Sequence, residues 1–151
     1  MMSKKLVIFL FILILAPIII YFLWPTDEAR IKKLVKQGAV AIEKKEIDDV
    51  MSKVSFNYQD DYGLSYALLK RVLEEQFKVM SDIKVEYENL KVEVKENSAT
   101  AEVDVRVVAT IGNQTGIIVG DPKTPAHLKF TLAKERVKWF VTKTEGLQPS
   151  L

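Results

Sequence analysis

The chain opens with one long apolar segment that starts at Leu6, ends at Trp24 and contains no charged residue. As a helix rising about 1.5 Å per residue, the segment would span roughly 28 Å, close to the hydrocarbon thickness of a bilayer. Tyr21 and Trp24 stand at its C-terminal end, where aromatic rings favour the headgroup layer. The pattern predicts a single membrane-spanning helix over residues 6–24.

A basic stub, residues 1–5, precedes this segment and carries Lys4 and Lys5. The stub fits a cleaved signal peptide or an uncleaved signal anchor. The long apolar run and the lack of a small-x-small cleavage site favour the anchor. A short basic stub normally stays in the cytoplasm, so we expect the domain on the extracytoplasmic side, periplasmic or extracellular. Cations soon after the span, at positions 30, 32, 33 and 36, count against this orientation.

Apolar residues continue at helical spacing beyond the span. The first helix of the domain is predicted over residues 27–44, with Thr26 as its N-cap and Ile31 and Ile42 on its apolar face. A short helix is predicted over residues 47–53. A long helix is predicted over residues 65–80, with Ser65 as its N-cap.

After residue 80 the apolar period changes from about 3.6 to 2. This alternation predicts long strands over residues 83–94, 101–107, 128–132 and 137–141. The first strand changes phase after Glu88 and Asn89, which predicts a bulge. Three shorter segments are predicted as a strand (54–58), a loop (112–125) and a hairpin turn (133–136). The order predicts an α+β domain over residues 27–148, with about three helices packed on a curved antiparallel sheet and a tail over residues 149–151.

The domain is close to neutral, because all 20 acidic residues and all but Lys4 and Lys5 of the 22 Lys and Arg lie beyond the span. Proteins that bind nucleic acid backbones normally carry a basic surplus, so no nucleic acid partner is expected. The chain has no cysteine, which excludes disulfides, thiol chemistry and cysteine-based zinc sites. No cofactor is expected.

Asp60 and Asp61 are adjacent carboxylates just before the long helix. Neighbours in an extended chain point to opposite faces, which argues against an acid–base dyad, and a calcium loop needs carboxylates at alternate positions. We therefore interpret the segment as a turn in which Gly63 takes a positive φ. Asp60 shares the alternation phase of Tyr58, so a place at a pocket mouth is the alternative.

His127 is the only histidine and alternates with Leu128 and Phe130, which predicts a place on the solvent face of its strand. No carboxylate partner is evident from the sequence. His127 is therefore not a catalytic candidate.

Three segments carry a resemblance to a known family. ARIKKLVKQGAVAIEKKEIDDVMSKVS supplies a first helix pair, FNYQDDYGLSYALLKRVLEEQFKVM a strand and a third helix, and VKWFVTKTEGLQ the closing strand. In this order they resemble the nuclear transport factor 2-like superfamily, whose cone-shaped fold also includes ketosteroid isomerase and scytalone dehydratase. The resemblance spans nearly all of residues 27–148. It implies a pocket between helices and sheet, frequent dimerisation, and functions from catalysis to scaffolding, among which the fold does not select.

Ketosteroid isomerase-like enzymes of this superfamily use a tyrosine on the first helix and aspartates that project from the sheet into the cavity. The predicted first helix of this chain has no tyrosine. The inward positions of the strands predicted after residue 80 are almost wholly apolar, with Tyr87 and Trp139 as partly polar exceptions. No catalytic residue is therefore assigned.

Two groups remain as binding candidates. Pockets combine apolar walls with a few polar groups, which suggests a pocket rim formed by Tyr58, Asp60, Tyr62, Tyr66, Tyr87 and Trp139. Ile117, Ile118 and Val119 lie between two glycines and are costly to expose, so they are candidates for an edge strand, a dimer contact, or contact with a partner or the membrane.

The sequence thus predicts a membrane-anchored, non-catalytic binding or assembly module, held by residues 6–24 and acting with a protein partner or as a homodimer. The alternative is a carrier of small hydrophobic ligands, or an isomerase- or dehydratase-like enzyme that uses the cone pocket.

Overall fold

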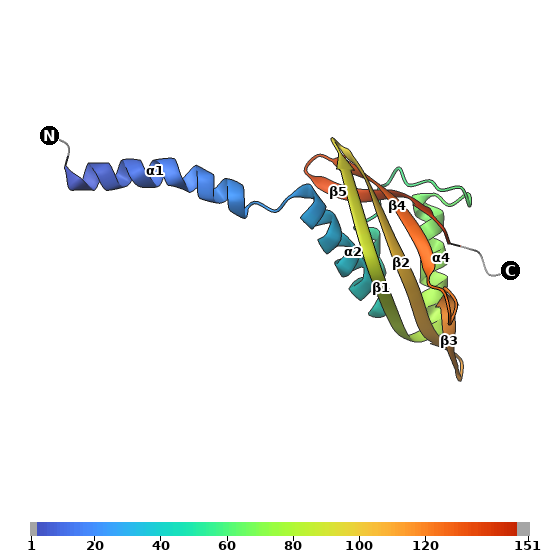
Figure 1. Cartoon of the computed structure of the whole chain (residues 1–151). Helices are drawn as coiled ribbons and strands as arrows, with labels where there is room; N and C mark the ends of the chain where they lie inside the picture. Colours follow the sequence, from blue (N-terminus) through green and yellow to red (C-terminus); the bar gives the residue numbers. More distant parts are fainter. Residues whose placement is uncertain (1–2, 148–151) are drawn as a thin grey trace.

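Helix α1 (Lys4–Leu23) extends from the domain as a separate rod (Figure 1). The structure is a computed structural model that describes residues 3–147; the start of the predicted stub and the predicted tail lie outside the described residues. No residue of α1 is buried, and the helix is long and apolar enough to cross a membrane. It starts earlier than predicted because the hydroxyl of Ser3 caps it, accepting a hydrogen bond from Leu6 N–H.

The three helices predicted for the domain are present as α2 (Asp27–Glu43), α3 (Ile47–Met51) and α4 (Tyr66–Val79). The hydroxyl of Thr26 accepts a hydrogen bond from the N–H of Ala29 at 3.1 Å, and that of Ser65 from the N–H of Leu68 at 3.4 Å. Both predicted N-caps are therefore confirmed. Helix α2 packs mainly against β1 and α3, whereas α4 buries none of its residues fully.

The sheet has five antiparallel strands, β1 (Met80–Lys95), β2 (Ser98–Ile111), β3 (Gln114–Val119), β4 (Ala126–Glu135) and β5 (Lys138–Glu145). The order is β1-β2-β4-β5, and β3 pairs with β2 beyond the stretch that pairs with β4. Strand β2 thus pairs with three strands. The predicted α+β class is confirmed.

Two predicted connections are wrong. The predicted loop over residues 112–125 contains β3, because its run of β-branched residues pairs with the end of β2, as the edge-strand alternative proposed. The predicted hairpin over residues 133–136 is shifted: β4 continues to Glu135, and the turn falls at Arg136, which has a φ of 60°, and Val137. Val137, the first residue of the predicted strand over residues 137–141, lies in this turn instead and is 71% exposed.

The predicted bulge in the first long strand is confirmed. The β1–β2 register shifts between Glu88 and Lys91, and Asn89 has a φ of 57°. Asparagine tolerates this left-handed conformation better than most residues. The bulge lets the apolar alternation change phase while both halves of β1 keep facing the helices.

Residues 54–58 run beside β5 but do not form the predicted strand, apart from one bridge between Val54 and Val141. The hydroxyl of Ser55 accepts a hydrogen bond from the N–H of Asn57 at 3.1 Å, and its carbonyl accepts one from the N–H of Tyr58 at 3.0 Å. This local turn replaces the ladder. As a result Phe56, which a strand over residues 54–58 would place on the same face as buried Tyr58, is 83% exposed.

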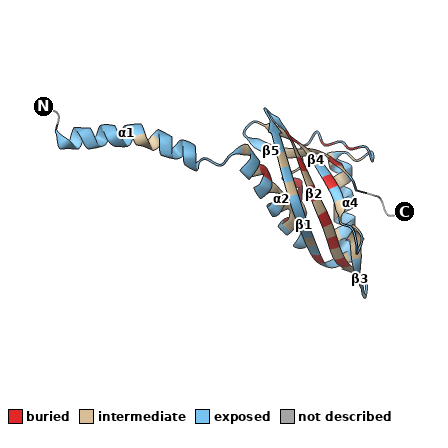
Figure 2. Cartoon of the chain, in the orientation of Figure 1, coloured by how far each residue is buried: buried red, intermediate tan, exposed pale blue. Residues whose placement is uncertain are grey.

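The core lies between the inner face of the sheet and the helices, and the buried positions shown in Figure 2 exclude α1. Alternate residues of β2 are buried from Ala99 to Ala109. One cluster gathers around Val103 and Val105, and a second packs Ile31 of α2 against Leu132 and Trp139. The second cluster fixes the start of α2 on the β4–β5 hairpin, close to the end of α1.

Candidate functional site

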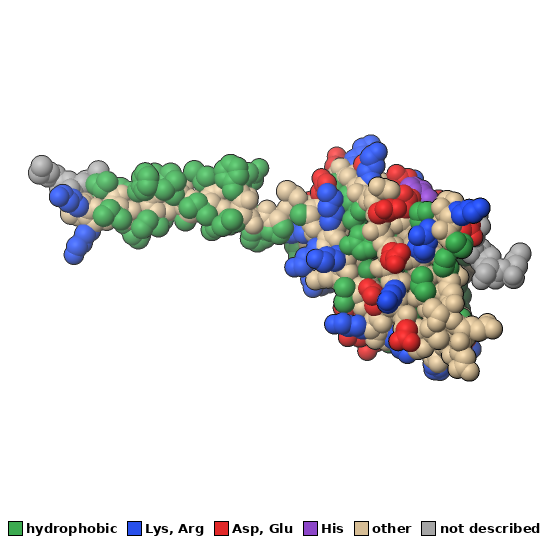
Figure 3. Space-filling model, turned by 60° about the horizontal axis from the view of Figure 1, so that its bottom comes forward, with side chains coloured by type: hydrophobic (Ala, Val, Ile, Leu, Met, Phe, Trp, Pro, Cys, Tyr) green, Lys and Arg blue, Asp and Glu red, His purple; other side chains and the backbone are tan. Residues whose placement is uncertain are grey.

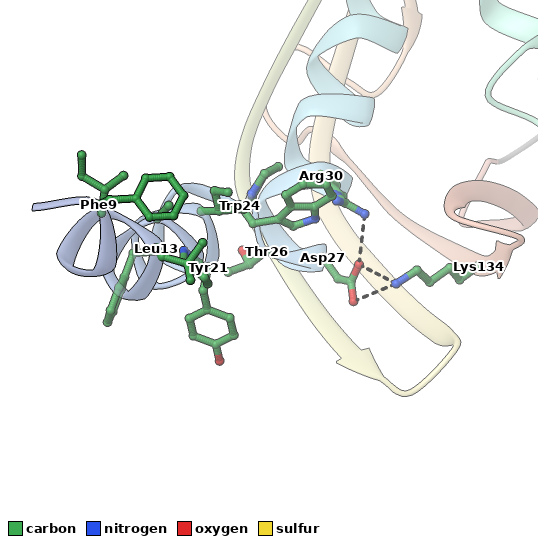
Figure 4. A pocket seen from close by; sticks show the side chains of 14 residues that line it. Phe9, Leu13, Tyr21, Trp24, Thr26, Asp27, Arg30 and Lys134 are labelled. Atoms are coloured by element: carbon green, nitrogen blue, oxygen red, sulfur yellow. Dashed lines mark hydrogen bonds and ion pairs between the residues drawn. The ribbon is translucent and has the colours of Figure 1, made fainter. Parts of the chain in front are cut away.

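Asp27, the first residue of α2, joins this helix to the β4–β5 hairpin (Figure 4). Its Oδ1 accepts a hydrogen bond from Nε1 of Trp139 at 3.0 Å and lies 3.2 Å from Nζ of Lys134. Nη1 of Arg30 lies 4.0 Å from the same oxygen. The hydrogen bond from Trp139 first, and then the contact with Lys134, lower the pKa of Asp27 against the raising effect of burial. The carboxylate is thus held ionised as a shared acceptor.

The same cluster reaches the end of α1. Cζ of Arg30 lies 5.7 Å from the centroid of the Trp24 ring, within the range of a cation–π contact. Only Trp24, Pro25 and Thr26 separate α1 from α2, and Pro25 has a fixed φ. The domain is therefore held close to the end of the apolar helix.

Three surface hollows surround α2. The junction hollow lies between α1 and the start of α2, and its lining includes Phe9, Leu13, Tyr21, Trp24, Asp27, Arg30 and Lys134 (Figure 4). The basic groove lies between α2, α3 and β1, and its lining includes Lys32, Lys33, Lys36, Lys44, Lys53, Glu46, Asp49, Tyr87 and Leu90. The hairpin hollow lies between α2, α3 and the β4–β5 hairpin, and its lining includes Arg30, Asp49, Lys53, Lys134, Val137, Lys138 and Trp139.

Cations outnumber carboxylates in these hollows although the domain as a whole is close to neutral. The lining of the basic groove has five lysines and two carboxylates, Glu46 and Asp49. The lining of the hairpin hollow has four cations and one carboxylate, Asp49, although Arg30 and Lys134 also contact Asp27. Figure 3 shows several Lys and Arg side chains at the edge of the domain beside α1. The basic groove has a volume of about 900 Å³, so it has room for a ligand of the size that protein pockets usually hold. The cationic lining of these hollows can bind an anion on the surface around α2.

The sequence interpretation missed this site. It assigned Asp27 only to the start of a helix, and it counted the lysines of α2 only toward membrane orientation. No local pattern pairs Asp27 with Lys134 and Trp139, because they meet only when the β4–β5 hairpin packs on α2.

Asp60 forms the turn that the sequence predicted and is buried. Its Oδ1 accepts hydrogen bonds from the N–H groups of Tyr62 at 2.9 Å and Leu64 at 3.0 Å, and Gly63 has a φ of 81°. Its Oδ2 accepts a hydrogen bond from the hydroxyl of Tyr58 at 2.8 Å. Burial is the main cause that raises the pKa of Tyr58. Asp61 lies outside this network and contacts Nζ of Lys143 at 3.1 Å.

The other residues of the predicted pocket rim occupy separate places. Tyr62 is exposed, and Tyr66 packs against Phe56 with ring centroids 4.8 Å apart. Tyr87 lines the basic groove, whereas buried Trp139 lines the hairpin hollow. Of the six residues of the predicted rim, Tyr58 and Asp60 are thus joined by a hydrogen bond, and the other four lie in different parts of the domain.

His127 lies on the solvent face, as predicted, but it has carboxylate partners that the sequence did not reveal. Its Nδ1 lies 2.8 Å from Oδ1 of Asp104, and its Nε2 lies 3.7 Å from Oε1 of Glu102. The contact with Asp104 is the main cause that raises the pKa of His127. Within residues 3–147, no group of three or more His, Asp or Glu side chains is placed to hold a metal ion.

Comparisons with known proteins bear on the fold. No family model matches the chain, and no curated protein matches it in sequence. A protein from Novosphingobium aromaticivorans provisionally assigned as a scytalone dehydratase is 13% identical, with a TM-score of 0.67 over 77% of this chain and 79% of that chain. A second protein from the same organism, provisionally assigned as an aromatic ring hydroxylase, is 18% identical, with a TM-score of 0.67 over 82% of this chain and 90% of that chain.

A third structure from this organism, an NTF2-like protein with a cystatin-like fold, is 13% identical, with a TM-score of 0.64 over 83% of this chain and 84% of that chain. Likeness at these identities concerns the backbone and carries no activity with it. The chain has the nuclear transport factor 2-like fold that its sequence resembles, preceded by an apolar helix.

Proposed function

We propose that the chain is a membrane-anchored, non-catalytic binding or assembly module whose domain acts at the extracytoplasmic surface of the membrane. The observation that carries this proposal is the junction between α1 and α2. Helix α1 leaves its whole apolar length unburied, while Asp27 ties the start of α2 to Trp139 and Lys134 of the domain. An apolar helix of this length is stable when lipid surrounds it.

The short junction restricts the domain to the membrane surface. Tethering raises the effective concentration of the domain toward other membrane components without any new contact. A module that assembles with a membrane protein gains from this arrangement, whereas an enzyme of freely diffusing substrates does not need it.

Strand β3 is the surface that we propose for a protein partner. Within the described residues β3 pairs only with β2, so its other edge offers unpaired backbone groups. Ile117, Ile118 and Val119 are half-buried, and the latter two pack against the core. An extended segment of a partner can add a strand to such an edge.

The first experiment tests orientation. The chain has no cysteine, so a Lys123→Cys variant carries a single exposed thiol in the β3–β4 loop. Labelling of intact cells with a membrane-impermeant maleimide should modify this thiol before lysis. Labelling only after lysis would place the domain in the cytoplasm and contradict the proposed side.

The second experiment tests the partner. A photoreactive amino acid replaces Ile117 in the full chain in native membranes, and a control variant carries it at Val137, which is exposed in the β4–β5 turn. A discrete protein adduct at Ile117 and none at Val137 is expected. An adduct of twice the chain mass would identify a second copy instead, and equal adducts at both positions would contradict the proposed edge.

The second candidate function is a carrier of small hydrophobic ligands or an isomerase- or dehydratase-like enzyme. It is supported by the likeness to the protein provisionally assigned as a scytalone dehydratase, and by α4, whose inward residues such as Leu69, Leu73 and Phe77 are only half-buried. Native mass spectrometry of the gently purified full chain tests it. A retained small molecule that is lost in Tyr58→Phe would favour this candidate over the assembly module.

A further inference from the structure

We infer that the basic hollows flanking α2 bind the phosphate groups of anionic phospholipids in the bilayer that holds α1. This inference rests on the proposed membrane anchoring and adds a ligand class to it. It concerns the basic groove, which runs along α2 from Lys32 to Lys44, and the hairpin hollow, whose lining reaches Trp24 at the end of α1.

The charge of these hollows selects an anion. Lys32, Lys33 and Lys36 line the basic groove together with two further lysines, and only Glu46 and Asp49 oppose them. Four cations line the hairpin hollow with Asp49 as the one lining carboxylate, and two of them, Arg30 and Lys134, also contact Asp27. Within these two hollows cations outnumber lining carboxylates, although the charges of the domain as a whole sum to about zero.

Several of these cations are available for a ligand. Lys32 pairs with Glu28 at 2.9 Å, but both side chains are about half-exposed, and such pairs are weak. Lys33, Lys36 and Lys44 are exposed and form no ion pair within residues 3–147. Binding a phosphate there would not require breaking an internal contact.

The position of the groove selects lipid over a soluble anion. Lys33 and Lys36 lie roughly 9 and 14 Å along α2 from Asp27, at about 1.5 Å per residue. Long lysine stems extend toward the headgroup layer, where an anionic surface attracts cations within about 10 Å. Tyr87 and Leu90 add an apolar side to the groove, which suits an amphiphile better than a bare inorganic ion.

The test compares three forms of the full chain in detergent by native mass spectrometry. They are the wild type, a Lys32→Gln/Lys33→Gln/Lys36→Gln variant, and a control variant, Lys78→Gln/Lys84→Gln/Lys123→Gln. The control lysines are exposed and lie on the end of α4, the start of β1 and the β3–β4 loop, at the end of the domain away from α1 (Figure 1). Each form is titrated with phosphatidylglycerol and with phosphatidylcholine.

The wild type should retain phosphatidylglycerol in preference to phosphatidylcholine. The groove variant should bind phosphatidylglycerol about tenfold more weakly, a conservative value for the loss of three lysines near an anionic surface. The control variant should match the wild type. Near-ultraviolet circular dichroism of each form establishes that the domain is folded. The comparison of the two lipids on the wild type needs no substitution, so it tests the inference even if a variant does not fold.

Three results would overturn the inference. The first is equal retention of the two lipids by the wild type. The second is an equal loss of phosphatidylglycerol binding in the groove and control variants. The third is displacement of the bound lipid by an equal concentration of inorganic phosphate. The last would show a site for soluble anions. Alkaline carbonate extraction of native membranes separates this inference from the anchoring proposal: release of the chain contradicts the anchor, whereas retention without lipid preference contradicts only the headgroup site.

Discussion

The indole N–H of Trp139 donates a hydrogen bond of 3.0 Å to Oδ1 of Asp27, and this bond ties the second residue of β5 to the first residue of α2. Trp139 is 5% exposed and packs on Ile31, so its N–H has little access to water. The start of α2, just after the junction with α1, is therefore held on the sheet by a contact between the two ends of the domain sequence.

Asp27→Ala should destabilise the domain by about 1–3 kcal/mol, because the buried indole N–H of Trp139 loses its acceptor. Asp27→Asn keeps an acceptor oxygen and should cost less than about 1 kcal/mol, since the lost ion pairs are partly exposed. Urea unfolding of the full chain in detergent, followed by near-ultraviolet circular dichroism, measures both. Equal losses in the two variants would show that charge, rather than the hydrogen bond, matters.

Acid should remove the contribution of Asp27. The hydrogen bond from Trp139 holds the pKa of Asp27 below its ordinary value of 3.8, so the unfolded chain binds the proton more readily. The stabilisation is present above pH 3.8 and is lost as the pH falls through the lower, folded value. The free energy of unfolding of the wild type, measured against Asp27→Asn, should therefore decrease between pH 6 and pH 3. A constant difference would contradict the lowered pKa.

Substitution of the Tyr58–Asp60 pair distinguishes a structural corner from a ligand site. Asp60→Ala leaves the N–H groups of Tyr62 and Leu64 and the hydroxyl of Tyr58 without their acceptor, so we expect a loss of about 2–4 kcal/mol. Tyr58→Phe removes one bond and should cost about 1–2 kcal/mol. Thermal unfolding of the full chain measures both. Unchanged stability with loss of a bound small molecule would instead identify a binding site.

Gly146 should not tolerate a side chain. A Cβ at this position would lie 2.1 Å from the carbonyl oxygen of His127, and the φ of 94° is unfavourable for other residues. We expect Gly146→Ala to cost more than about 2 kcal/mol. Gly112→Ala is the matched control, since φ is 63° and nothing lies within 4 Å of the added Cβ; it should cost about 1 kcal/mol. Similar unfolding midpoints for the two variants would contradict the predicted clash.

His127 should titrate above its ordinary pKa of 6.5, because Asp104 accepts a hydrogen bond from its ring. The contact stabilises the folded chain below pH 6.5, and this effect is lost as the pH rises through the raised pKa. Proton NMR of the single histidine measures the value directly. Asp104→Asn should lower it, whereas Glu102→Gln, at a distance of 3.7 Å, should change it less. A pKa at or below 6.5 in the wild type would show that the contact does not form.

Local patterns predicted most elements of the fold. Thr26 and Ser65 marked two helix starts, and the phase change at Asn89 marked the bulge, because caps and bulges depend on residues close in sequence. Residues 54–58 misled because the hydroxyl of Ser55 favours a turn over a ladder. The alternation of Phe56 and Tyr58 fits either conformation.

The candidate site was beyond the reach of local patterns. Asp27 and Lys134 are separated by 107 positions, and only the packing of the β4–β5 hairpin on α2 brings them together. The net charge of the domain is close to zero and gives only the sum of its charges, so it does not reveal that lysines gather on one surface. The lysines of α2 become a site only when α3 and β1 form the other walls of the groove.

The position of all helices before all strands has a consequence during synthesis on the ribosome. Strand β1, against which α2 mainly packs, is made soon after the helices, but the cluster around Ile31 of α2 is completed only when the residues around Trp139 in β5 have been made. Roughly 110 residues separate these partners, which takes about 5–20 s at usual translation rates. By then α1 has left the ribosome, so under the proposed anchoring the domain would complete its core while already attached to the bilayer. If the proposed anchoring holds, loss of the last strand should leave an anchored but unfolded chain, open to proteolysis at the membrane surface.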